Sequence, residues 1–280
     1  MAKVLMFHRV LPDKLISQPN AYSSFGTLIS LEYFEHVIKL LKSESYEFVT
    51  ISQLVKNENN EKLVALTFDD GYADNFEYAM PLLQKNNITA TFFPVIEPCK
   101  ENSVLPLDIY YQCVDELITN DEARADYIKG ETKKKFYYLE PLAQMQFLNE
   151  LFSGLPSQSR VSYMSGYQLK FLSDNGFEIG SHGITHSLLT ADYMNDLKAS
   201  IEMKQSKLWL ETILDREVTS YCFPSGKYNN NMVELAKRAG YKSICLISKN
   251  KNHTNSLPCF ERVFVKQNSL DELKLELKRK

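Results

Sequence analysis

Two adjacent carboxylates follow an apolar run in this 280-residue chain, in the segment Leu66–Gly71, which reads LTFDDG. Neighbouring side chains at the end of a strand point in different directions, so one of Asp69 and Asp70 can bind a metal while the other moves a proton. The plainer alternative is a solvated turn in which these acids cap the next helix. The pair alone does not decide between the two interpretations.

Two histidines stand four residues apart in segment 179–186, IGSHGITH. This spacing lets one turn or loop present His182 and His186 to a single metal ion. A lone histidine is more often structural, but a pair that is joined by a carboxylate predicts a metal site. Asp70 or Asp69 would complete a two-histidine, one-carboxylate set with open positions for water and substrate. Zn²⁺ is the default ion for such ligands, with Co²⁺, Ni²⁺ or Mn²⁺ as alternatives.

Three weaker candidates lie at the ends of other apolar runs. Ser225 belongs to segment 223–226, FPSG, where proline and glycine favour a tight loop whose backbone N–H groups can face a site. His8 ends the first apolar run, and Arg262 begins the last one. Taken alone, an ordinary turn, a near-core histidine and a surface ion pair are the simpler interpretations.

Short apolar runs alternate with longer amphipathic stretches, which predicts β-α units around a parallel sheet. The expected strands are Lys3–Phe7, Phe48–Ile51, Val64–Asp69, Ala90–Val95, Phe177–Ser181, Thr219–Phe223, Ser243–Ile247 and Arg262–Val265. The expected helices are Leu31–Lys42, Asn75–Lys85, Asp192–Ile213 and Asn229–Ala239, the last of which ends at Gly240. Because parallel strands form a functional face at their carboxyl ends, the candidate residues would meet at one end of a single α/β domain over residues 1–280.

Residues 97–163 break this pattern. They are rich in predicted helix and in aromatic side chains, and they include three consecutive lysines, Lys133–Lys135. We expect a helical insertion over one end of a barrel. It could shape a substrate site, or it could be helical padding without such a role.

Composition excludes several classes of function. Charged residues make up 24% of the chain and the formal charge is −3, unlike the basic surface that a nucleic-acid-binding protein needs. No apolar stretch approaches the length of a membrane span. The N-terminal apolar segment is too short for a signal peptide, and five cysteines without a C-x-x-C pair favour reduced, mostly buried thiols. We therefore expect a cytoplasmic protein with at most peripheral contact with the inner membrane.

The order of these motifs resembles that of the polysaccharide deacetylases, the NodB-homology family or carbohydrate esterase family 4. Segments 67–71 (TFDDG), 182–186 (HGITH) and 223–226 (FPSG) are similar to the family's first three motifs. Segments 164–169, 202–211 and 235–241 also fit, so the resemblance covers most of the chain outside residues 97–163. It implies a distorted (β/α)₇-type barrel and a divalent-metal-dependent hydrolase that removes N-acetyl groups from amino sugars.

The resemblance also implies roles for individual residues. Asp69 would be the general base, and Asp70, His182 and His186 would be the metal ligands. The backbone N–H of Ser225, where the family often has tyrosine, would help to bind the oxyanion.

Two departures from the family pattern affect this assignment. Cys222 stands where the third motif commonly has an arginine that braces the catalytic aspartate, and no histidine follows Arg262 to supply the usual general acid. Segment 6–10, MFHRV, resembles the poly-N-acetylglucosamine deacetylase branch, in which the acid histidine comes from the first strand. We therefore predict that His8 is the general acid and that Arg262 replaces the missing brace.

The expected substrate is an N-acetylated sugar on the route to a surface glycan, either nucleotide-linked, lipid-linked or a short oligosaccharide. Most relatives that trim finished wall or matrix polymers are exported, whereas no leader is recognised here. Two other functions stay open. One is another metal-dependent C–N hydrolase acting on a formyl, ureido or cyclic amide group. The other is a non-catalytic glycan-binding barrel, which Cys222 in place of arginine would favour.

Overall fold

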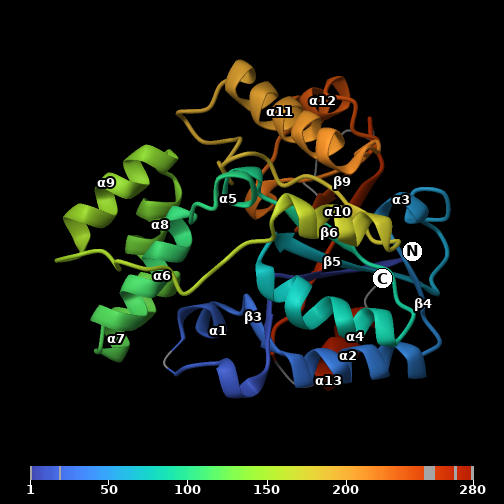
Figure 1. Ribbon diagram of the computed structural model, residues 1–280, viewed down its shortest axis with the longest axis horizontal. Coiled ribbons are helices and arrows are strands. Elements are labelled where there is room, and N and C mark those ends of the chain that lie inside the picture. The colour runs from blue at the N-terminus through green and yellow to red at the C-terminus, as the bar shows by residue number, and fades with distance from the viewer. Residues whose placement is uncertain (1, 19, 249–255, 268–269, 279–280) are drawn as a thin grey trace.

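Parallel strands form the centre of the molecule, with helices around them (Figure 1). The computed structural model describes residues 2–18, 20–248, 256–267 and 270–278. The strands are β1 (Lys3–Phe7), β2 (Arg9–Leu11), β3 (Leu28–Ser30), β4 (Glu47–Val49), β5 (Leu63–Asp70), β6 (Thr91–Pro94), β7 (Glu178–Ile179), β8 (Ser220–Cys222), β9 (Ser243–Leu246), β10 (Cys259–Glu261) and β11 (Val263–Phe264). The α-helices are α1 (Ala21–Phe25), α2 (Leu31–Ser43), α3 (Ile51–Leu54), α4 (Met80–Lys85), α5 (Ile96–Glu101), α6 (Pro106–Leu117), α7 (Asp121–Lys129), α8 (Glu131–Tyr137), α9 (Pro141–Leu151), α10 (Gly166–Asp174), α11 (Asp196–Leu214), α12 (Asn230–Arg238) and α13 (Leu270–Lys278). Other helical turns are η1 (Asp13–Leu15), the π-helical η2 (Asn75–Ala79) and η3 (Pro224–Gly226).

Backbone pairing, one bridge and one chain connection arrange most of the strands in a ring, outside which β4 pairs with β5 and β2 pairs with β3. β1 pairs with β5, β5 with β6, and β6 with β7. A bridge between Ser181 and Tyr221 continues from β7 to β8, which pairs with β9, and β9 pairs with β10. The chain then runs through Arg262 into β11, which pairs with β1. The predicted parallel α/β fold is confirmed, and this order of strands is compatible with the predicted distorted barrel.

The alternation of side chains along β5 directs one carboxylate into the ring. Phe68 lies beside Phe7 and Phe92 on the neighbouring strands, with ring centroids 5.3 and 4.9 Å away, and Phe34 of α2 packs edge-on against it. Burying each of these rings contributes about 1.5–3 kcal/mol. Because successive side chains in a strand face opposite sides, Asp69 points away from this outer layer and into the ring.

A smaller apolar cluster fills the interior of the ring, where the side chains are mostly compact. It contains Val4, Ala65, Phe93, Cys222, Cys245 and Phe260, with Ile51, Leu54 and Leu63 beside them. All five cysteines, each within the described residues, are free and buried, as predicted.

Side-chain caps fix where several helices begin. The side chains of Ser30, Asn195 and Asn229 each accept a hydrogen bond from the backbone N–H three residues later, at the starts of α2, α11 and α12. The cap at Asn195 makes the predicted start at Asp192 wrong, because the helix begins only at Asp196. Gly240 follows α12 with φ of 90°, as expected for a helix end.

Other predicted boundaries also need correction. Ile51 begins α3 rather than ending a strand, because Thr50 forms a capping box with Gln53. The helix predicted over Asn75–Lys85 opens with the π-helical turn η2 before α4. The parallel pair β2–β3 was not predicted, since three-residue strands give too little alternation to recognise.

Residues 97–163 are helical, as predicted, and α6, α7, α8 and α9 gather at one side of the strands (Figure 1). Asp108 of α6 fastens this segment to the rest of the molecule. Its buried carboxylate accepts hydrogen bonds from Tyr22, Tyr72 and Tyr163. None of the helices in the described residues is long and apolar enough to span a membrane.

Candidate functional site

A cavity of about 660 Å³ lies where the strands end, and every predicted site residue lines it. These residues are His8, Asp69, Asp70, His182, His186, Ser225 and Arg262. They come from positions far apart in the sequence, but the parallel strands bring their carboxyl ends to the same face of the ring. The structure therefore brings together all the residues that the sequence singled out.

Asp70, His182 and His186 form a group that can hold a metal ion. Oδ1 of Asp70 is 3.5 Å from Nε2 of His182 and 3.6 Å from Nε2 of His186. This oxygen is buried and has no hydrogen-bond partner in the part of the chain that the structure describes. Two imidazoles and a carboxylate are suitable ligands for Zn²⁺ and similar ions, so the residues present fit a divalent metal.

The electrostatics of this group also favour a cation. Burial and the charge of Asp69 raise the pKa of Asp70 well above its usual range. Burial lowers the pKa of both His182 and His186. The histidines are thus in the neutral form that ligates metals, and a divalent ion would supply the positive charge that an ionised Asp70 lacks.

Hydrogen bonds to Glu202 of α11 fix the loop between the two histidines. Glu202, which is buried, accepts hydrogen bonds from the backbone N–H groups of Ile184 and Thr185 at 2.6 and 3.2 Å and from the Thr185 hydroxyl at 2.7 Å. Nδ1 of His182 lies 2.8 Å from the carbonyl oxygen of Cys222, which leaves Nε2 facing Asp70. Such outer contacts fix the orientation of metal-binding histidines.

Asp69, His182 and Cys222 form a second group with metal-ligand spacing. It is the less suitable of the two. Both carboxylate oxygens of Asp69 already accept hydrogen bonds from Arg262, and burial raises the pKa of the Cys222 thiol well above its usual range. A protonated thiol is a poor metal ligand.

Arg262 binds Asp69 through both terminal nitrogens of its guanidinium. Nη1 and Nη2 each donate to a different carboxylate oxygen at 2.7 Å, and Nη1 also lies 3.2 Å from the Thr67 hydroxyl. The thiol of Cys222 is 3.8 Å from both Asp69 oxygens. The family pattern would place an arginine at position 222 to brace Asp69. In this chain Arg262 supplies that positive charge instead.

His8 follows β1 directly and is fixed by its backbone, whose carbonyl accepts a hydrogen bond from Asn75 at 2.8 Å. Its ring packs edge-on against Phe264, with 5.5 Å between centroids. Nδ1 is buried and has no hydrogen-bond partner among the described residues. Burial lowers the pKa of His8 to about 4, although the charge of Asp69 acts in the opposite direction. The imidazole is therefore neutral at pH 7 in this structure.

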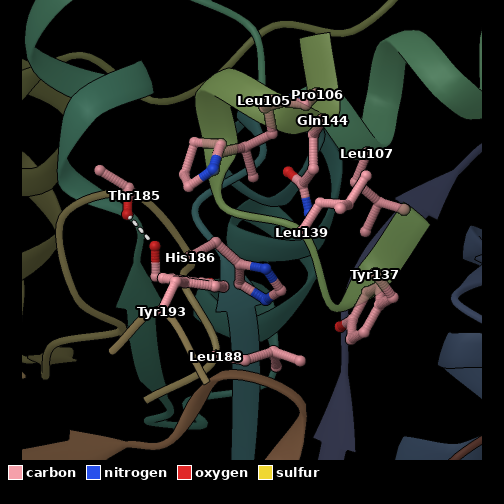
Figure 2. Close-up of a pocket in the computed structure, with 12 residues that line it drawn as sticks. Leu105, Pro106, Leu107, Tyr137, Leu139, Gln144, Thr185, His186, Leu188 and Tyr193 are labelled. Atoms are coloured by element: carbon pink, nitrogen blue, oxygen red, sulfur yellow. Dashed lines mark hydrogen bonds between the residues drawn. The ribbon is translucent and has the colours of Figure 1, made fainter. Parts of the chain in front are cut away.

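Ser225 lies in η3 with φ of 56°, a left-handed conformation that is costly for a residue other than glycine. Its hydroxyl is hydrogen-bonded to the hydroxyl of Tyr137, which belongs to α8 in the helical segment. Tyr137 and His186 line a small hollow of about 20 Å³, and their ring centroids are 6.5 Å apart. Both side chains are labelled in Figure 2. Burial raises the pKa of Tyr137, so its hydroxyl stays protonated and can donate a hydrogen bond.

Two residues of this site were not predicted. Tyr137 was visible only as one aromatic residue of many in residues 97–163, and nothing in its spacing indicated that it faces the site. Glu202 lay in a segment that fits the family, but its contact with the histidine loop needs the folded chain. The sequence signal that could have identified Glu202 was a carboxylate on a long predicted helix between two family motifs.

The profile of the family described as polysaccharide deacetylase matches residues 56–244. A curated relative from Bacillus subtilis (strain 168), "Putative polysaccharide deacetylase YxkH", is 21% identical over 244 residues. That match covers 85% of this chain and 62% of the relative, so the chain spans less than two thirds of the relative's length.

Two solved structures share the fold over nearly the whole chain. The Streptococcus pyogenes deacetylase PplD in complex with acetate has a TM-score of 0.64 and 19% identity, covering 99% of this chain and 98% of its own. IcaB from Ammonifex degensii has a TM-score of 0.64 and 17% identity, covering 99% and 97%. At these identities the likeness concerns the fold.

Proposed function

The chain belongs to the polysaccharide deacetylase family, and from this premise we propose that it is a metal-dependent hydrolase that removes an N-acetyl group from an amino sugar. One observation carries the proposal. A two-histidine, one-carboxylate group and a second carboxylate bound by an arginine line the same cavity. The first set suits a divalent metal and the second suits a general base, which are the two requirements of metal-assisted amide hydrolysis.

In this proposal a divalent ion held by Asp70, His182 and His186 would polarise the acetyl carbonyl and acidify a water molecule. Asp69 takes a proton from the water as its oxygen bonds to the acetyl carbon. The backbone N–H of Ser225 donates to the carbonyl oxygen as negative charge develops on it. The C–N bond then breaks, acetate forms, and the sugar nitrogen takes a proton from His8.

The low pKa of His8 determines where that proton comes from. Because burial lowers the pKa of His8 to about 4, the neutral imidazole is the favoured form at pH 7 and needs to gain a proton during the reaction. We propose that the proton taken by Asp69 is passed to His8 and from there to the sugar amine. Arg262 orients Asp69 and keeps it ionised between turnovers.

The finer proposal concerns the substrate and location. We propose an N-acetylated sugar that is nucleotide-linked or lipid-linked, or a short oligosaccharide, used to build a surface glycan. Zn²⁺ is the metal expected first for this ligand set. Cytoplasmic location stays a prediction.

The test combines metal analysis with an acetate-release assay on N-acetylated sugar nucleotides and oligosaccharides. We expect one metal per chain and acetate release by the wild type. Asp69→Asn and His8→Ala should lower kcat by about 10²–10⁴-fold, the usual contribution of general acid–base groups. His182→Ala should instead lose the metal.

Other outcomes would contradict the proposal. Metal without acetate from any sugar would favour a different amide substrate or a binding role. Full activity of metal-loaded Asp69→Asn would remove the general base assignment, and a protein that binds no metal would refute the proposal as a whole.

A further inference from the structure

Lys133 of α8 is buried in the wall of the cavity, with 6% of the residue exposed. Its Nζ has no hydrogen-bond partner among the described residues. The ammonium lies 4.1 Å from the ring centroid of Tyr111 and 5.3 Å from that of Tyr137. Asp108 attracts it through space without a hydrogen bond between them. A lysine amino group therefore faces the cavity with aromatic rings around it and no anion in contact.

Aromatic rings offset only part of the cost of removing an ammonium from water. Burial accordingly lowers the pKa of Lys133 well below its usual range. A negatively charged group that entered the cavity would provide the missing partner, and the lysine would bind it as a fully charged donor. Unpartnered buried polar groups of this kind call for an explanation in a native structure.

The other charged side chains of the cavity lining are mostly positive, although the chain as a whole carries a formal charge of −3. Four exposed lysines line it beside Lys133, and these are Lys129, Lys134, Lys227 and Lys266. Among the described lining residues the acids are Asp69 and Asp70. Arg262 neutralises the first, and a divalent metal would neutralise the second. The cavity thus concentrates positive charge where a substrate would bind.

Tyr137 links this lysine to the reaction site. Its ring contacts the Lys133 ammonium on α8 and lies 6.5 Å from the ring of His186. A group bound by Lys133 would therefore lie one aromatic ring away from the metal ligands. At that separation, one small substrate could place one substituent at Lys133 and its acetyl group at the metal ligands.

We propose that Lys133 binds an anionic group, a phosphate or a carboxylate, on the acetylated sugar, and that the cavity selects charged N-acetylated sugars over neutral ones. This inference rests on the proposed deacetylase function and narrows its substrate class.

The first test compares three acetylated sugars with the metal-loaded protein. They are N-acetylglucosamine 1-phosphate, N-acetylmuramic acid, which carries a carboxylate, and the neutral methyl N-acetylglucosaminide. We expect kcat/KM to be higher for a charged sugar by about 10–100-fold, the range of a charge-assisted hydrogen bond. The charged sugar with the higher kcat/KM shows whether the site prefers a phosphate or a carboxylate.

Variants of one helix separate Lys133 from its neighbours. Lys133→Met should lower kcat/KM for the preferred charged sugar by about 10-fold or more and leave the neutral sugar within about twofold. Lys133→Arg should retain the preference. Lys135→Met is the matched control, because Lys135 is exposed on α8 and does not line the cavity. Thermal melting checks the fold, and methionine should keep the apolar packing among the rings.

A binding measurement distinguishes failure of this inference from failure of the proposed function. Calorimetric titration of the metal-free protein with N-acetylglucosamine 1-phosphate should show weaker binding by Lys133→Met than by the wild type. If no sugar is hydrolysed but this difference remains, the proposed function fails and the anion site stands. Acetate release without a charge preference, or a folded Lys133→Met that keeps the preference, would overturn the inference.

Discussion

Arg262 binds Asp69 in a bidentate contact, in which Nη1 donates a hydrogen bond to Oδ1 and Nη2 donates one to Oδ2, both at 2.7 Å. The arginine lies between β10 and β11, whereas the aspartate is near the end of β5, and the contact reaches across β1, which pairs with both β11 and β5. Both side chains are buried. A guanidinium in this geometry fixes the rotation of the carboxylate as well as its charge, which a lysine could not do.

The acid side of the pH–rate profile should depend on Arg262. Burial raises the pKa of Asp69, but the charge of Arg262 and the hydrogen bonds from its guanidinium act in the opposite direction and hold that pKa below its usual range. The base therefore stays ionised until the pH falls through this low value. In Arg262→Gln the pKa of Asp69 should rise, and the acid limb of kcat/KM should move to higher pH by about one unit or more.

The profile of Arg216→Gln provides the control, since Arg216 is an exposed arginine that pairs with Asp174. Arg262→Lys should give an intermediate shift, because it keeps the charge and loses the second hydrogen bond. An acid limb that does not move in Arg262→Gln, with the protein folded, would show that Asp69 is not the group that limits activity at low pH.

Metal affinity should depend on Glu202, although this residue is not itself a ligand in the proposed site. Its carboxylate binds two backbone N–H groups and the Thr185 hydroxyl in the loop that carries His182 and His186. Glu202→Gln keeps one acceptor oxygen but replaces the other with an NH2 donor and removes the negative charge, so the loop should be held less firmly. We expect metal affinity to fall by about 10–100-fold, as measured by competition with a chelator.

Glu211→Gln on the same helix is the comparison, because Glu211 pairs with Lys207 rather than with the histidine loop. Restoring activity of Glu202→Gln with excess metal would support a positioning role. Unchanged metal affinity would show that the histidine loop holds its shape without this carboxylate.

The strands and the metal-ligand candidates were predictable from the sequence because they follow strong local rules. An apolar run ending in Asp69 and Asp70 predicts a buried strand with two carboxylates at its functional end, and β5 has this form. The same reasoning led to His182 after the strand that ends near Ser181. In a parallel fold, knowing which residues end the strands is enough to predict which residues meet.

The contributions of the helical segment could not be predicted in this way. Tyr137 reaches Ser225 because the tertiary structure places α8 beside η3, and no periodicity encodes that docking. The pairing of Arg262 with Asp69 was expected from a departure in the family pattern rather than from any local signal. Contacts between distant segments require the tertiary structure, whereas strand ends do not.

The docking of the helical segment should depend on Asp108. Its carboxylate accepts hydrogen bonds from Tyr22 at 2.6 Å, from Tyr72 at 3.0 Å and from Tyr163. Asp108→Ala leaves three buried hydroxyl groups without this acceptor, and each such loss costs about 1–3 kcal/mol. We expect the free energy of unfolding in urea to fall by about 3–5 kcal/mol.

Two variants calibrate this measurement. Tyr163→Phe removes one of the three hydrogen bonds and should cost about 1 kcal/mol. Asp121→Ala changes an exposed carboxylate at the start of α7 and should cost less than about 0.5 kcal/mol. Equal stability of Asp108→Ala and the wild type would show that apolar packing alone docks the helical segment.

The hydroxyl of Tyr137 should contribute to turnover through its contact with Ser225. This contact ties α8 to the loop whose backbone N–H is proposed to bind the oxyanion, and the left-handed Ser225 needs such support. Tyr137→Phe keeps the ring beside His186 and Lys133 but removes the hydroxyl. We expect kcat to fall by about 10-fold, less than the 10²–10³-fold loss that follows removal of an oxyanion donor itself, with metal content unchanged.

A double-mutant cycle with Ser225→Ala separates the two ways in which the hydroxyl can act. If Tyr137 works by holding Ser225, each single variant should lose about as much kcat as the double variant, because all three remove the same contact. If the hydroxyl donates directly to the substrate, Ser225→Ala should remain close to the wild type while Tyr137→Phe does not. Tyr167→Phe, which alters a tyrosine that is 91% exposed, should have no effect. Full activity of Tyr137→Phe would leave the helical segment with no part in the chemical step.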